Sequence, residues 1–200
     1  MPFSRRSIRL PGYDYTQSGA YFVTICTQDR LPLFGEVSGG IMRLDQIGQI
    51  VSTCWAALPA AFPYITLADW VVMPNHFHAI VIINGGKGEA SAGRMNDDPM
   101  GFAADASPLQ DARPYAPTLN RPNGTNPGSL GAFLQNFKSV STRKINTLRG
   151  TPGLRLWQRN YYEHILRSDD DLNRVRTYIR ENPISWVFDR ENLAYQGPKP

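Results

Sequence analysis

Two neighbouring apolar segments, residues 65–72 and 76–83, constrain the fold of this chain most strongly. Both are rich in β-branched and aromatic residues, which favour strands, and the Pro-Asn pair between them favours a turn or a bulge. The sequence therefore predicts either two strands with a very short connection or one long bent strand. Two of the chain's three histidines, His76 and His78, interrupt the second segment. Because buried polar side chains cost free energy unless a partner satisfies them, both are candidate functional residues.

The periodicity of apolar residues predicts an alternation of strands and helices. In chain order we expect a strand at 20–28, a helix at 43–58, strands at 65–72 and 76–83, a helix at 129–148, a strand at 161–167 and a helix at 169–182. The last helix begins after Ser168, a good N-cap, and ends at Asn182 because Pro183 disfavours helical dihedrals at the preceding residue. Short connections and half-polar strands favour an α+β fold, a ferredoxin-like antiparallel sheet with helices packed on one face.

Residues 84–128 differ in kind from the rest of the chain. Glycine, proline and small polar residues occur throughout this segment, and no period is sustained. Such a composition buries too little apolar surface to offset the entropy lost on ordering. We expect a flexible inserted loop that splits a single domain into residues 1–83 and 129–200.

Charge and cysteine content limit the class of protein. Residues 129–200 contain twelve Lys or Arg against seven Asp or Glu, whereas the first 128 residues contain nine against ten. This asymmetry favours a polyanionic partner, although an ordinary solvated surface is an equally good explanation of the charge alone. Cys26 and Cys54 stand apart, the N-terminus lacks the apolar core of a signal peptide, and no apolar run has the length of a membrane span. We expect a cytoplasmic protein that does not bind membranes.

Strand alternation places His76 and His78 on one face of the sheet and Phe77 on the other. Two imidazoles about 6–7 Å apart along one strand can converge on a divalent ion. The alternative is a pair of core histidines satisfied by backbone groups or water.

The last helix offers further chemistry, because Tyr178 and Asn182 are four residues apart and share one face. An amide oxygen suits Mg²⁺ or Mn²⁺, and a phenol can attack a bound phosphate. The alternatives are a core tyrosine and a helix-stop asparagine. Spacing alone does not favour Tyr178 over Tyr161 or Tyr162.

Five blocks of the sequence, in this order, resemble the REP-associated tyrosine transposases, which belong to the single-tyrosine branch of the HUH nucleases. The blocks are RRSIRLPGYDYTQSGAYFVTICTQDR, MPNHFHAIV, SLGAFLQNFKSVSTRKIN, WQRNYYEHILRSDDDL and RTYIRENPISW. The resemblance covers nearly the whole chain except residues 84–128. It implies that His76 and His78 bind a metal ion, Mg²⁺ or Mn²⁺, that Asn182 completes the metal site, and that Tyr178 is the nucleophile.

The implied activity is cleavage and rejoining of single-stranded DNA through a 5′-phosphotyrosine, at hairpins of repetitive extragenic palindromes. A second 3′-hydroxyl reverses the first step and joins new ends. His164 is a candidate general base, although a structural role in its strand fits it better. We expect the DNA to be held by basic residues, namely Arg5, Arg6, Arg9, Lys138, Arg143, Lys144, Arg155 and Arg159.

Two rival functions remain open from the sequence. One is a non-catalytic nucleic-acid-binding module on the same fold, which would form no covalent adduct with DNA. The other is a metallophosphoesterase that uses bound water, for which Tyr178 would be dispensable. Whether the protein is a monomer or a homodimer is also left open.

Overall fold

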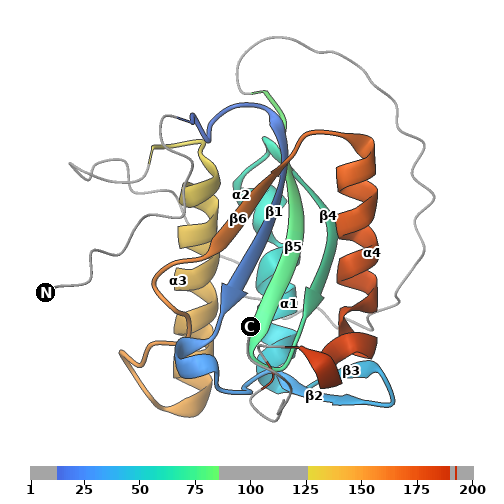
Figure 1. Ribbon diagram of the computed structural model, residues 1–200. Coiled ribbons are helices and arrows are strands. Elements are labelled where there is room, and N and C mark those ends of the chain that lie inside the picture. The colour runs from blue at the N-terminus through green and yellow to red at the C-terminus, as the bar shows by residue number, and fades with distance from the viewer. Residues whose placement is uncertain (1–12, 86–125, 190–191, 193–200) are drawn as a thin grey trace, which may run out of the picture.

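The computed structural model describes residues 13–85, 126–189 and 192. Every predicted strand and helix is present, and residues 35–44 add a short hairpin that the sequence analysis did not predict (Figure 1). The strands are β1 (Gly19–Cys26), β2 (Gly35–Ser38), β3 (Ile41–Leu44), β4 (Ile65–Val72), β5 (His76–Ile83) and β6 (Tyr162–Leu166). The α-helices are α1 (Gln46–Ala56), α2 (Leu58–Ala61), α3 (Leu130–Arg149) and α4 (Asp169–Ser185), and the 3-10 helices are η1 (Gln28–Arg30) and η2 (Trp186–Phe188).

Four strands form one antiparallel sheet in the order β4-β5-β1-β6. Strand β1 pairs with β5 on one side, from Gly19 opposite Ile83 to Cys26 opposite His76, and with β6 on the other. Strands β4 and β5 are separate and joined by a tight connection, so the prediction of two strands is correct. Two split β-α-β units in this order make the ferredoxin-like sheet that the sequence predicts.

Helices cover both faces of this sheet. The larger core joins α1 and α3 to one face, where Val23, Phe77 and Trp55 are fully buried. The prediction of helices packed on one face holds for these two, but α4 lies on the opposite face. In Figure 1, α3 and α4 flank the sheet from opposite sides, and α1 lies behind it. Helix α4 takes this position because its apolar stripe packs against Phe22 and Ile80, which alternate with the residues of the larger core.

The start of the first helix differs from the prediction. Residues 43 and 44, expected to be helical, belong to β3, and Asp45 is the N-cap, accepting hydrogen bonds from the N–H groups of Ile47 and Gly48. The preceding hairpin turns at Gly39 and Gly40, both with positive φ. A Gly-Gly pair between strands is typical of such a turn. The hairpin was missed because the apolar residues from residue 44 onward have helical spacing, so residues 43 and 44 were assigned to the helix.

The end of the last helix also differs. Helix α4 continues through Pro183 to Ser185 instead of ending at Asn182. The preference of a residue before proline for extended dihedrals is thus overcome in the last turn, where tertiary packing holds Asn182 in the helix with only 3% of its surface exposed.

Most of residues 84–128 lie outside the described part of the chain, so the split domain and the flexible insertion stay predictions. Within the described residues, no helix combines the length and the apolar character that a membrane crossing requires.

Candidate active site

His76 and His78 lie side by side on β5, on the face that α4 covers. Both are buried, with 0% and 3% of their surfaces exposed, and their ring centroids are 4.5 Å apart. Phe77 between them points to the other face and packs against Trp55 and Phe137. The alternation inferred from the sequence is therefore correct, and the two imidazoles come closer than their backbone spacing alone suggests.

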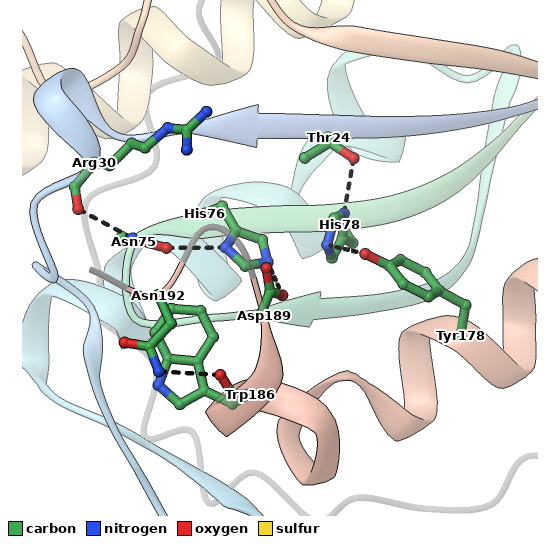
Figure 2. Close-up of polar contacts among 9 residues, drawn as sticks. All are labelled: Thr24, Arg30, Asn75, His76, His78, Tyr178, Trp186, Asp189 and Asn192. Carbon is green, nitrogen blue, oxygen red and sulfur yellow. Dashed lines mark hydrogen bonds and ion pairs between the residues drawn. The ribbon is translucent and has the colours of Figure 1, made fainter. Parts of the chain in front are cut away.

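The ring of His76 is oriented by Asn75. Asn75 Nδ2 donates to the carbonyl oxygen of Arg30 at 3.0 Å, which directs Asn75 Oδ1 toward His76 Nδ1 at 2.9 Å (Figure 2). Because the amide oxygen only accepts, His76 Nδ1 carries the proton. The lone pair of a neutral His76 is therefore on Nε2, which is buried and has no hydrogen-bond partner among the described residues.

His78 lies between β1 and α4. Its Nδ1 is 2.8 Å from Thr24 Oγ1, its ring stacks on Phe22, and its Nε2 is 3.3 Å from the hydroxyl of Tyr178. Tyr178 reaches across from α4, as Figure 2 shows, and its ring meets that of Phe22 edge to face. Tyr178 and His78, which the family resemblance both places in the active site, thus lie in contact.

Burial keeps both imidazoles neutral. It lowers the pKa of His76 to about 4, although the nearby carboxylate of Asp189 acts in the opposite direction. Burial also lowers the pKa of His78 well below its ordinary value, and the neighbouring His76 adds to this effect. Neutral imidazole is the form that binds metal ions, so near neutral pH no proton has to be removed before a cation binds.

The side-chain oxygen of Asn182 is a second buried atom of this cluster, and it accepts hydrogen bonds or binds cations. This Oδ1 atom has no hydrogen-bond partner among the described residues, and the Asn182 side chain lies close enough to His76 to favour the charged form of that imidazole. The Asp189 carboxylate is 4.0 Å from His76 Nε2. Buried polar atoms of native proteins are almost always satisfied by a protein group, water or an ion, so His76 Nε2 and Asn182 Oδ1 are candidates for binding a ligand.

The donor set fits a divalent cation. Two imidazole nitrogens and one amide oxygen are suitable ligands for a hard or borderline ion. No three His, Cys, Asp or Glu side chains are grouped as a metal site within the described ranges. The amide oxygen of Asn182 would therefore have to complete the set. Asn75 and Thr24 accordingly occupy the positions from which partners orient metal-binding imidazoles.

An open groove of about 680 Å³ gives access to this cluster. His78, Tyr178, Asn182 and Asp189 line it together with aromatic rings, and 47% of the Tyr178 surface is exposed. The alternative of a core tyrosine is therefore wrong for Tyr178. Tyr161 and Tyr162 also line the groove, but the phenolic hydroxyl that lies 3.3 Å from His78 Nε2 belongs to Tyr178.

The predicted DNA-binding residues do not all lie together. Arg143, Arg155 and Arg159 line a second groove of about 1370 Å³ between α3 and the segment that follows it. Lys144 is exposed and lies outside this lining, near Cys54 of α1, whose thiol pKa it lowers slightly against the effect of burial.

Lys138 lines the same groove, but its ammonium is also hydrogen-bonded to the backbone of the loop after α3. Its ammonium donates to the carbonyl oxygens of Gln158 and Arg159, at 2.6 and 3.0 Å. Burial lowers the pKa of Lys138 to about 8. Lys138 thus holds the loop that follows α3 while it lines the groove, and its role in DNA binding stays a prediction. Arg5, Arg6 and Arg9 lie outside the described residues.

His164 is not part of the cluster around His76 and His78 and is paired with an aspartate instead. Its Nε2 is 2.9 Å from Asp171 Oδ2 near the start of α4, which fits the structural role expected of it. The sequence reasoning missed Asn75, Thr24 and Asp189. Asn75 could have been found, since a polar residue next to buried histidines needs a partner, whereas Thr24 and Asp189 carry no sequence signal that separates them from ordinary strand and loop residues.

No model of a known protein family matches the chain. A solved structure of a REP-associated tyrosine transposase bound to a REP hairpin is similar in fold, with a TM-score of 0.55 and 16% identity, over 91% of this chain and 76% of that one. An uncharacterized protein of Haemophilus influenzae is 34% identical over 187 residues, which cover 93% of this chain and 92% of that protein. Identity of this extent means that the chain belongs to the same protein family as the Haemophilus influenzae protein.

Proposed function

We propose that this protein is a metal-dependent transposase that cleaves and rejoins single-stranded DNA through a 5′-phosphotyrosine on Tyr178, with REP-type hairpins as substrates. The observation that carries the proposal is the contact between the Tyr178 hydroxyl and His78 Nε2, at 3.3 Å in an open groove. The similarity in fold to a REP-associated tyrosine transposase bound to a REP hairpin supports it.

His76, His78 and Asn182 would hold the cation. When bound, a Mg²⁺ or Mn²⁺ ion supplies Lewis-acid stabilisation of the charge that develops on the phosphoryl oxygens. His78 Nε2 has one lone pair, so it cannot bind a cation and accept the Tyr178 proton at the same time. The phenolic proton therefore leaves to solvent in the groove.

Tyr178 performs the covalent step. Its phenolic oxygen attacks the phosphorus, the bond from phosphorus to the 3′ oxygen breaks, and that oxygen takes up a proton to become a free 3′-hydroxyl. Attack by another 3′-hydroxyl on the phosphotyrosine reverses the exchange and releases Tyr178. The edge-to-face contact with Phe22 holds the ring in place, and such positioning contributes much of the rate.

The decisive experiment compares three tyrosines. Tyr178→Phe removes only the hydroxyl, so we expect no protein–DNA adduct on a denaturing gel and nearly unchanged binding of single-stranded DNA. Tyr161→Phe and Tyr162→Phe are matched controls, because both residues line the same groove, and each should still form the adduct. An adduct that persists in Tyr178→Phe would overturn the proposal, and binding by wild-type protein without any adduct would favour the non-catalytic module.

A further inference from the structure

The two grooves share one segment of the chain in their linings. Gln158 and Asn160 line both the basic groove next to α3 and the groove at the histidines. A single extended ligand, such as a polymer strand, can therefore lie along the arginines and pass over this segment into the candidate active site. Lys138 holds this segment in place because its ammonium donates hydrogen bonds to the Gln158 and Arg159 carbonyl oxygens.

The groove at the histidines carries unusually exposed aromatic rings. Tyr162 is 51% exposed and Phe188 is 75% exposed, and both line this groove. Phe22 supports Tyr162 from beneath, edge to face, with ring centroids 6.4 Å apart. Exposed rings gathered in a groove indicate a binding surface, whereas scattered exposed apolar residues do not.

We propose that Tyr162 and Phe188 form a stacking surface for an unpaired base of the DNA strand, beside the phosphate that Tyr178 attacks. The inference rests on the proposed function and adds two positioning residues to it. A nucleotide joins a flat apolar base to an anionic backbone, and the two neighbouring grooves offer aromatic rings in one and three arginines in the other. Neither an apolar peptide nor a lipid chain would use both features.

Stacking of a base on an aromatic ring does not depend on which base it is, and its loss weakens binding by roughly 5- to 100-fold per base. We therefore expect Tyr162→Ala and Phe188→Ala each to raise the Kd for a short single strand by about tenfold. Tyr162→Phe keeps the ring and should bind like the wild-type protein. A stacked 2-aminopurine placed next to the cleaved position should lose fluorescence with wild-type protein and regain it with the alanine variants.

Val187→Ala is the matched control. Val187 is 64% exposed and precedes Phe188, but it does not line the groove. This variant should leave the Kd unchanged. Because Tyr162 and Phe188 are largely exposed, their variants should fold, and unchanged thermal unfolding would verify this.

The outcomes separate the two proposals. Alanine variants that bind and quench like wild type would overturn the stacking surface while leaving Tyr178 as the nucleophile. Ring-dependent binding without any covalent adduct would support the stacking surface and overturn the proposed reaction. Equal loss in Val187→Ala would also count against stacking, because a general effect on this segment would then explain the result.

Discussion

At the scale of single residues, the partners of the Nδ1 atoms of His76 and His78 orient the two imidazole rings. Asn75 places the proton of neutral His76 on Nδ1, and the Arg30 carbonyl fixes Asn75 in turn. The Asn75 backbone oxygen accepts from the N–H and the hydroxyl of Thr27, so the whole turn is rigid. A buried imidazole held in one tautomer presents its lone pair without reorganisation.

Asn75→Ala tests this arrangement through metal binding. The substitution leaves the His76 ring and its lone pair but removes the group that orients them, so we expect a 10- to 100-fold weaker affinity for Mn²⁺. Calorimetric titration of the protein, first freed of metal with EDTA, measures the affinity. Asn84→Ala is the control, because Asn84 lies at the other end of β5 and bonds the exposed Thr66. Unchanged Mn²⁺ affinity in Asn75→Ala would refute the orienting role, and full adduct formation in EDTA would refute the metal.

Much of this residue-scale chemistry was open to sequence reasoning. His76, His78 and Asn182 are donor-bearing side chains in apolar surroundings, and burial of such groups implies a partner. Their roles stay predictions, but the structure brings them together with Tyr178. The choice among Tyr178, Tyr161 and Tyr162 could not be made from spacing, because the packing of α4 on the sheet is what places the Tyr178 hydroxyl beside His78.

At the scale of elements, helix α4 carries half of the candidate site, and ion pairs to β4 hold it on the sheet. Ser168 caps its N-terminus, where three aspartates follow. Further along, Arg176 and Arg180 both pair with Asp69 of β4. These contacts hold α4 against the face of the sheet that carries the histidines, and Tyr178 and Asn182 come with it.

The loop between α3 and β6 depends on Lys138 in a way that pH can reveal. The Lys138 pKa falls from 10.5 to about 8 in the folded protein. Between these values the unfolded chain binds more protons, so the free energy of unfolding rises with pH as the buried charge is lost. We expect the difference in unfolding free energy, wild type minus Lys138→Met, to increase from pH 8 to 9.5.

Urea denaturation across this pH range measures that difference. Lys144→Met is the control, since Lys144 is exposed on the same helix, and its difference from wild type should not vary with pH. A difference for Lys138→Met that stays constant or decreases would contradict the assigned pKa. Only the fold reveals this lysine, because the carbonyl oxygens that it binds lie twenty and twenty-one residues further along the chain.

At the scale of the whole molecule, the basic residues of the C-terminal part fall into two groups, those that line the basic groove and those that make structural contacts. Arg143, Arg155 and Arg159 line the basic groove, whereas Lys138 stabilises the loop and Arg176 and Arg180 hold α4. A count of charges along the sequence treats all of these residues alike. The groove that leads to the histidines is therefore better defined by three arginines than by the net charge.

The salt dependence of DNA binding distinguishes basic residues that contact phosphates from those that do not. Each phosphate contact that is lost lowers the slope of log Kd against log salt by about one. Arg143→Gln should show this decrease and weaken binding of all sequences similarly. Lys144→Gln is the neighbouring control on α3, outside the groove lining, and should keep the wild-type slope. Fluorescence anisotropy at several salt concentrations measures both, and equal slopes for the two variants would argue against the basic groove as the DNA path.

The sequence by itself determined the order of the elements, the ferredoxin-like sheet and the shared face of His76 and His78, because these follow from local periodicity and from strand alternation. It did not determine the Gly39–Gly40 hairpin, the extension of α4 past Pro183 or the bound state of Lys138. Those depend on contacts between residues far apart in the chain. Tertiary packing alone set the Tyr178 hydroxyl 3.3 Å from His78, across one hundred residues of sequence.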